Sequence, residues 1–152
     1  MIIWFTGQPG AGKTTMAKKL YVMYSDYMQM ENVIHLDGDD LRSIMDNQDY
    51  SDNGRRKNIS FAMNMAKVLS NKNYIVIVSM VSPFLDMREQ LKSSCDVIEF
   101  YLTTTEVRGR EKFFCDDYEP PKKNFTLINT DFTEEETFDE ILHVCRSVAA
   151  VS

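Results

Sequence analysis

Eight consecutive residues near the start of the chain have the types and spacing that bind a polyphosphate. They read Gly7-Gln8-Pro9-Gly10-Ala11-Gly12-Lys13-Thr14 and match the pattern G-x-x-x-x-G-K-[ST] at every fixed position. In this P-loop pattern the glycines let backbone N–H groups point inward, and these amides bind phosphate together with the N-terminus of the following helix. Lys13 is predicted to neutralise the β- and γ-phosphates, and the Thr14 hydroxyl to ligate Mg²⁺. The predicted nucleotide-binding residues of this stretch are Gly7, Gly10, Ala11, Gly12, Lys13, Thr14 and Thr15.

Paired carboxylates and nearby arginines supply the other groups that phosphoryl transfer needs. Moving a γ-phosphoryl group onto a hydroxyl requires Mg²⁺, cations that absorb charge, and a carboxylate that orients or deprotonates the hydroxyl. Asp37 and Asp39 lie one residue apart, which suits a split between the metal shell and the acceptor. Arg42 and Arg55 are candidates to hold an anionic group of the acceptor, because a guanidinium fork binds such oxygens bidentately. Asn58 would add an amide contact.

The rest of the sequence predicts the scaffold that positions these residues. Apolar, β-branched runs alternate with helical periodicity, which is typical of a parallel sheet covered by helices on both faces. The predicted fold class is α/β, a P-loop NTPase three-layer sandwich on a five-stranded parallel sheet. Ligands of such folds bind beyond the carboxyl ends of the strands, so the polar residues after the first four strands should meet at one rim. Strands are expected at about residues 2–6, 33–37, 74–79, 97–102 and 125–129, and helices at about 13–28, 39–45, 52–71, 84–94 and 134–149.

Individual elements carry their own signals. The unbroken apolar run Val76-Ile77-Val78 indicates a central strand that is buried on both faces. Asp131 or Thr133 is expected to cap the last helix, where Glu134, Glu135 and Glu136 suit the dipole of the first turn. No repeat or Ser/Gly-rich linker divides the chain, so residues 1–152 are expected to form one domain.

Composition excludes several classes of protein. The 152 residues are 43% hydrophobic and 26% charged, which is typical of a globular protein. The net charge of −6 disfavours nucleic acid or a membrane surface as partner, because proteins that bind either one need an extended basic surface. No run approaches the ~20 apolar residues of a membrane span, and no signal peptide is recognised, so a cytoplasmic location is expected. The three cysteines lack C-x-x-C spacing, which predicts free thiols.

The chain resembles the adenylylsulfate (APS) kinases, small P-loop kinases that phosphorylate the ribose 3′-hydroxyl of adenylylsulfate. The P-loop is shared by many NTPases, but further motifs follow in the order of this family. Residues 37–42 read D-G-D-D-L-R where the family has D-G-D-N-[VIL]-R, and Tyr50-Ser51 with Arg55 and Asn58 stand for F-S-x-x-x-R-x-x-N. Residues 78–83 match the strand and [IV]-S-P turn of the family, and residues 118–121 are similar to Y-E-x-P.

The resemblance implies a role for each candidate residue, with ATP and Mg²⁺ as cofactors. It implies that Asp39 contacts the acceptor hydroxyl and that Asp37 belongs to the Mg²⁺ shell. From its position after the fourth strand, Arg108 is expected to help neutralise the transferring charge, with Arg110 or Lys112 as further candidates. Ser82 corresponds to a serine that carries phosphate in some members. The family also implies a nucleotide acceptor, a homodimer and a place in sulfate assimilation. The implied catalytic residues are Lys13, Asp37, Asp39 and Ser82; the metal ligands are Thr14 and Asp37; the substrate contacts are Asp39, Arg42, Arg55, Asn58, Val81 and Ser82; and Arg108 joins the nucleotide site.

The sequence departs from the family pattern where the acceptor is expected to bind. The family has a long lid that reads K-G-L-Y-x-K-A-R-x-G-x-x-x-N-F-T-G, whereas here a short lid spans about residues 106–121. Phe113 or Phe114 is a candidate for the missing aromatic clamp, and core packing is an equal alternative for both. Ser60-Phe61 replaces the two arginines of the family's N-I-R-R segment, and Gly54 replaces the acid before Arg55. A kinase of another nucleotide-linked acceptor, such as cytidine diphosphoramidate, is therefore the alternative.

Switch GTPases and ATPases, which change conformation with the bound nucleotide, are an alternative from a different class. Guanine-binding switches use N-K-x-D after a strand, but Asn71-Lys72-Asn73-Tyr74 lacks the Asp and precedes the third strand. Switch ATPases place an Asp after an apolar strand, whereas the third strand ends in Ser79. A non-catalytic nucleotide-binding module remains as the last alternative, and the joint presence of the P-loop, D-G-D and Arg55 argues against it.

Overall fold

A five-stranded parallel sheet forms the centre of the molecule. The structure is a computed structural model that describes residues 1–151. Neighbouring strands pair in parallel throughout, in the spatial order β2-β3-β1-β4-β5. The connections between parallel strands must cross over a face of the sheet, and helices make these crossings. The strands are β1 (Ile2–Thr6), β2 (Val33–Asp37), β3 (Ile75–Ser79), β4 (Val97–Thr103) and β5 (Thr126–Asn129).

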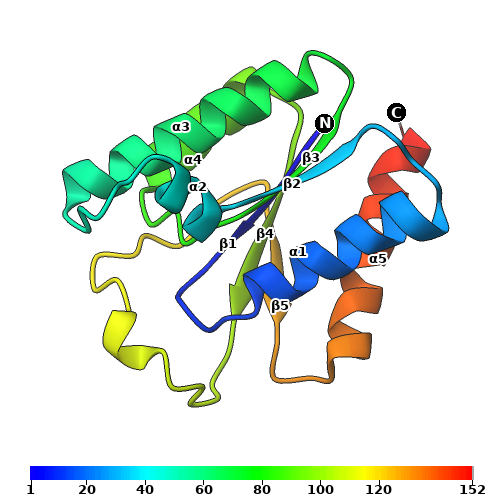
Figure 1. Cartoon of the computed structure of the whole chain (residues 1–152). Coiled ribbons are helices and arrows are strands. Elements are labelled where there is room, and N and C mark those ends of the chain that lie inside the picture. Colours follow the sequence, from blue (N-terminus) through cyan, green and yellow to red (C-terminus); the bar gives the residue numbers. More distant parts are fainter. Residues whose placement is uncertain (152) are drawn as a thin grey trace.

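Helices cover both faces of this sheet. One face carries α1 (Lys13–Val22) and α5 (Glu134–Val151), and the other carries α2 (Gly38–Ile44), α3 (Asp52–Ser70) and α4 (Leu85–Ser94) (Figure 1). The predicted three-layer α/β fold and its five strands are therefore confirmed, with strand bounds that differ from the expected ones by one residue at most. Within residues 1–151, no helix is both long enough and apolar enough to cross a membrane.

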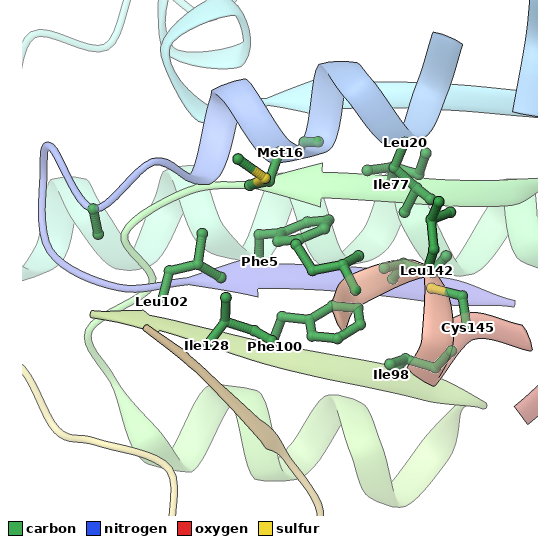
Figure 2. Close-up of a cluster of buried hydrophobic side chains, with 14 of the residues drawn as sticks. Phe5, Met16, Leu20, Ile77, Ile98, Phe100, Leu102, Ile128, Leu142 and Cys145 are labelled. Carbon is green, nitrogen blue, oxygen red and sulfur yellow. The ribbon is translucent and has the colours of Figure 1, made fainter. Parts of the chain in front are cut away.

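Each face of the sheet has its own hydrophobic core because successive residues of a strand point to opposite faces. Ile3 and Phe5 of β1 belong to the cluster under α1 and α5, and Ile2 and Trp4 belong to the cluster on the other face. Phe5 stacks on Phe100 of β4 with ring centroids 5.1 Å apart, in the cluster that Figure 2 shows. Burial on both faces explains why the strands read as continuous apolar runs.

The central position of β3 follows the prediction from its sequence. Val76, Ile77 and Val78 have no exposed surface, and β3 lies between β2 and β1. The three cysteines are free thiols, as expected.

The first helix differs from its prediction. It was expected to run to about residue 28 as a regular α-helix, but from Met23 to Tyr27 it continues as a π-helical turn in which the Met28 N–H bonds to the Met23 carbonyl. The wider turn lets Met23 and Tyr24 pack against the core under α5. Hydrophobic periodicity does not resolve a single such turn, because it depends on packing against a distant helix.

The choice of cap for the last helix is resolved in favour of Thr133. The Thr133 hydroxyl accepts from the Glu136 N–H at 3.2 Å, and the Glu136 carboxylate accepts from the Thr133 N–H at 3.0 Å. These reciprocal bonds form a capping box. Asp131 instead accepts hydrogen bonds from Thr104 and Thr105 after β4, so it fixes the loop that leads into the lid.

Candidate active site

The P-loop occupies the turn between β1 and α1 and wraps around a buried lysine. Gly7 has φ +146°, and a Cβ there would overlap the Leu102 carbonyl of the neighbouring strand, so the loop requires glycine at this position. The Lys13 ammonium donates to the Gln8 carbonyl at 2.8 Å. Burial lowers the pKa of Lys13 to about 8, against the attraction of Asp37 and Asp39. The ammonium is thus largely removed from water, and an anionic ligand would stabilise its charged form.

Asp37 is the centre of a hydrogen-bond network at the end of β2. Its carboxylate accepts from the hydroxyls of Thr14 at 2.8 Å and Ser79 at 2.7 Å, and from the Asp39 N–H at 3.0 Å. Burial opposes the ionisation of Asp37, but these hydrogen bonds outweigh it and lower the pKa of the carboxyl. The Ser79 hydroxyl also lies 2.7 Å from Nε2 of His35. Since the Ser79 proton goes to Asp37, Ser79 accepts from an Nε2–H tautomer of His35.

The predicted Mg²⁺ ligands fit this arrangement chemically. Thr14 and Asp37 offer a hydroxyl and an ionised carboxylate that already touch, and both line the same cavity. Mg²⁺ prefers such oxygen ligands and is commonly bound through one or two carboxylates together with substrate phosphates and water. The two side chains are therefore suitable to hold the ion next to a bound triphosphate.

A cavity of about 1370 Å³ brings most of the candidate residues together. Its walls come from the segments that follow β1, β2, β3, β4 and β5, as expected for one rim of a parallel sheet. Gly7 and Ala11 of the P-loop lie behind the wall and do not line the cavity. The candidate residues that line it are Gly10, Gly12, Lys13, Thr14, Thr15, Asp37, Asp39, Arg42, Arg55, Asn58, Val81, Ser82 and Arg108.

Three of the predicted acceptor contacts, Arg42, Arg55 and Asn58, lie on the helices α2 and α3. Arg42 donates through Nη1 to the carbonyls of Asn47 and Asp49, and its guanidinium lies 4.2 Å from the ring centre of Tyr50. This arginine therefore fixes the 47–50 loop as well as lining the cavity. Asn58 donates to the Gly38 carbonyl, and its buried carboxamide oxygen has no hydrogen-bond partner within the described part of the chain.

Ser82 is placed differently from the other candidates. Its side chain is buried, accepts from the Trp4 indole at 2.8 Å and donates to the Met80 carbonyl at 3.1 Å. Ser82 also adopts φ +44°, which turns the chain sharply beside the cavity. With the hydroxyl engaged on both sides, this geometry favours a structural role for Ser82 over a catalytic one.

The short lid is fastened to the P-loop at two points, Arg108 and Cys115. Arg108 donates to the carbonyl of Gly10 at 3.1 Å and to the hydroxyl and carbonyl of Thr130. At the second point, the carboxamide of Gln8 bonds to both the N–H and the carbonyl of Cys115. Arg108 was expected to face the transferring phosphate, and here its donors are directed to oxygens of Gly10 and Thr130 and to the Glu106 carboxylate at 2.9 Å.

The two lid phenylalanines stand beside basic side chains at the cavity. Phe113 and Phe114 both line the cavity and are 52% and 42% exposed, so neither is a core residue. The guanidinium of Arg110 and the ammonium of Lys112 lie 5.3 and 4.9 Å from the ring centre of Phe113. The core-packing alternative is therefore wrong for both rings. A role as aromatic clamp stays a hypothesis for either one.

Several residues of the site have no signal in the sequence. Gln8 and Cys115 meet only because the lid folds back over the P-loop, and Thr130 reaches it from the end of β5. Gly54 is buried against the Asp49 carbonyl, where a Cβ would overlap. Ser79 was noted only as the end of a strand, although its position opposite Asp37 in the β2–β3 register could have suggested the contact.

The fold and the P-loop cavity define a nucleotide-binding α/β protein of the P-loop phosphotransferase class. A family model described as adenylylsulphate kinase matches residues 1–113. The chain belongs to the adenylylsulphate kinase family, as its motifs predicted. The matched region ends inside the short lid.

Individual relatives and solved structures agree with this assignment. A cytidine diphosphoramidate kinase of Campylobacter jejuni is 30% identical over 151 residues, which cover 96% of this chain and 88% of that protein. An adenylyl-sulfate kinase of Prochlorococcus marinus is 32% identical over 147 residues, covering 91% of this chain and 72% of that protein. The structure of the Mycobacterium tuberculosis APS kinase in complex with AMPPNP and APS superposes with a TM-score of 0.78 at 20% identity, covering 95% and 96% of the two chains.

Proposed function

We propose that the protein is an ATP- and Mg²⁺-dependent kinase that transfers the γ-phosphoryl group to the 3′-hydroxyl of adenylylsulfate. The observation that carries the proposal is the single cavity that joins the P-loop, the two aspartates of the D-G-D motif, and Arg55 with Asn58. A donor phosphate on the P-loop and an acceptor beside Arg55 would therefore be in reach of each other. Family membership and the relatives named adenylyl-sulfate kinases support the same acceptor.

The residues of the cavity divide the chemistry between them. Lys13 offsets charge on the phosphates, and its burial makes that interaction stronger than it would be in water. Asp39, whose carboxylate is exposed to the cavity, orients the acceptor hydroxyl and takes its proton as the new P–O bond forms and the bond to the leaving ADP breaks. Thr14 and Asp37 would hold Mg²⁺, which would supply positive charge to offset that of the triphosphate.

A second acceptor is favoured by a specific observation. The C. jejuni relative named cytidine diphosphoramidate kinase aligns with 96% of this chain and with 88% of its own length, so it shares the compact size. The adenylylsulphate kinase model, by contrast, stops at residue 113. The acceptor is therefore adenylylsulfate or, as the second candidate, another nucleotide with a short anionic group such as cytidine diphosphoramidate.

The identity of the acceptor is tested by product analysis. Purified protein with ATP and Mg²⁺ is given adenylylsulfate, cytidine diphosphoramidate or other cytidine and uridine diphosphate derivatives, and the products are identified by mass. A phosphorylated adenylylsulfate supports the first acceptor and a place in sulfate assimilation, and transfer only to a cytidine nucleotide supports the second. If the protein binds ATP and phosphorylates none of these compounds, the kinase proposal fails and the non-catalytic nucleotide-binding module takes its place.

The partners and the location are proposed from the same function, that of a small-molecule kinase. The partner is a small-molecule nucleotide, with neither nucleic acid nor a membrane involved, and the protein acts in the cytoplasm. A homodimer is proposed on the family resemblance. Tyr21 and Tyr27 on the first helix and its π-helical turn are 37% and 78% exposed and offer apolar surface for such a contact. Sedimentation equilibrium on the wild type and on Tyr27→Ser tests it.

A further inference from the structure

Cys115 connects the P-loop to the arginine of the acceptor site. Its thiol accepts from Nη1 of Arg55, although the two residues are 60 positions apart in the sequence. Cys115 is buried and lines the cavity. Its own backbone is held by the carboxamide of Gln8, with 2.9 Å from the Cys115 N–H to Oε1 and 2.8 Å from Nε2 to the Cys115 carbonyl. A continuous chain of three hydrogen bonds thus runs from Gln8 to Arg55.

The side chain of Gln8 acts on the lid and not on the nucleotide site. Gln8 belongs to the P-loop, but its side chain does not line the cavity and bonds the lid instead. Two antiparallel hydrogen bonds to one residue fix both the position and the orientation of that residue. The segment is anchored again three residues later, where the Tyr118 hydroxyl lies 2.8 Å from the Thr6 hydroxyl at the end of β1. The backbone of Cys115 therefore has little freedom.

Arg55 retains the means to bind an acceptor while it contacts the thiol. A guanidinium carries five N–H donors, and the contact with Cys115 uses one of them. A long, flexible side chain loses entropy when it is ordered, so a partner that orders Arg55 in advance lowers the cost of binding an anion. The thiol is a weak acceptor, which suits a contact that directs the arginine without competing with a phosphate or sulfate.

We propose that Gln8 and Cys115 are positioning residues that hold Arg55 in the orientation in which it binds the anionic group of the acceptor nucleotide. The inference rests on the proposed function, because it takes Arg55 as an acceptor contact. It assigns to a P-loop side chain an effect on the acceptor instead of on ATP. It also explains how a lid of this length contributes to acceptor binding.

The first test separates the two substrates. Cys115→Ala removes the partner of Arg55 and is expected to raise the KM for the acceptor about two- to tenfold, the scale of one ordinary hydrogen bond, while the Kd for ATP stays within twofold. Cys115→Ser keeps an acceptor atom for Arg55 and should restore most of the affinity. Cys95→Ala is the matched control, because this half-buried thiol lies outside the cavity. An unchanged acceptor KM in Cys115→Ala, or an equal loss for acceptor and ATP, would overturn the proposal.

A double-mutant cycle tests whether Gln8 and Cys115 act on Arg55 through the same series of hydrogen bonds. Gln8→Leu alone should raise the acceptor KM about as much as Cys115→Ala, and the double variant should be little worse than either single variant. Additive effects would show that Gln8 and Cys115 act independently and would overturn the proposed chain. The assays use whichever of adenylylsulfate and cytidine diphosphoramidate the wild-type protein phosphorylates.

Hydrogen exchange gives a readout that does not require activity. The Cys115 amide bonds to Gln8, so its exchange should become at least tenfold faster in Gln8→Leu, while amides of β3 keep their protection. Unchanged exchange of the Cys115 amide in this variant would contradict the link between the P-loop and the lid. Because this measurement needs no acceptor, it remains decisive if neither nucleotide is phosphorylated and the proposed function itself fails.

Discussion

On the nucleotide side of the cavity, Lys13 and Thr14 begin α1 directly after the glycines of the P-loop, and Asp37 ends β2, which pairs with β3 over five residues. On the acceptor side, Arg55 is held by a thiol of the lid, and Arg42 is held by carbonyls of an exposed loop. The P-loop turn and the end of a buried strand place the first set through backbone geometry, whereas hydrogen bonds from helix side chains to the lid and to a loop place the second. The nucleotide site is therefore set by the fold, and the acceptor site by contacts that a few substitutions can alter.

Asp39 lies where the two sides meet, and its substitution should have the largest effect. Asp39→Asn removes the base but keeps the size of the side chain, so turnover should fall by about 10²- to 10⁴-fold while the affinity for ATP is kept. Steady-state kinetics and nucleotide titration measure the two quantities. Asp40→Asn, at the exposed neighbouring position, is the control and should be close to wild type. Loss of ATP affinity in Asp39→Asn would assign the residue to the nucleotide side.

Lys13 tests the nucleotide side alone. Lys13→Ala removes a buried cation next to the phosphates, and both ATP affinity and turnover should fall, with turnover lower by about 10²- to 10³-fold. Lys18→Ala on the exposed face of the same helix is the matched control. The acceptor affinity, measured by direct binding, should stay unchanged. A selective loss of acceptor binding in Lys13→Ala would contradict the division of the cavity into two sides.

Arg88 tests how much a buried ion pair stabilises the fold next to Ser82, on the acceptor side. Its guanidinium pairs with Glu99 at 2.9 Å, both side chains are 2% exposed, and it also donates to the carbonyls of Ser82 and Glu119. Arg88→Met leaves the Glu99 carboxylate buried with less compensation, so the free energy of unfolding should drop by about 3 kcal/mol. Arg56→Met breaks an exposed pair with Asp86 and should cost about 1 kcal/mol or less in a urea titration. Equal costs would show that burial of the Arg88 pair is unimportant.

Gly54 tests the loop that leads into Arg55. Gly54→Ala places a methyl group against the Asp49 carbonyl, so the loop must shift, at a cost of about 1–3 kcal/mol in unfolding free energy. The shift should also raise the acceptor KM, because Arg55 is the next residue. Asn53→Ala, at an exposed position of the same helical turn, is the control for kinetics and for thermal unfolding. A rise in the KM for ATP instead would weaken the comparison of the two sides.

The effect of pH on ATP binding is the smallest expected change. Burial lowers the pKa of Lys13 to about 8 in the free protein, and a bound polyphosphate favours the charged form. Below pH 8 the lysine is already charged, so it adds no pH dependence there. Above pH 8 binding must take up a proton, and affinity should fall by up to about tenfold per pH unit. Titration calorimetry at pH 8.5–9.5 in two buffers with different ionisation enthalpies measures the proton uptake, and Lys13→Arg should abolish it.

The nucleotide side was predictable from the sequence almost completely. The P-loop, the Asp37 and Asp39 positions and the five strands all follow from contiguous patterns, and the structure gathers them as expected. The family assignment from these motifs is confirmed. The roles assigned to single residues remain predictions, and Ser82 and Arg108 have partners that their motifs did not indicate.

By itself the sequence determined the fold class, the positions of the strands and the phosphate-binding loop, because each depends on residues that are neighbours in the chain. Periodicity and the glycine spacing of residues 7–14 are local signals of this kind. Only the tertiary structure decided what the lid does, because Gln8 and Cys115 are 107 positions apart and Cys115 and Arg55 are 60 apart. Hydrogen bonds act over about 3 Å and carry no mark in the sequence when their partners are distant, so contacts of this kind are visible only after the chain has folded.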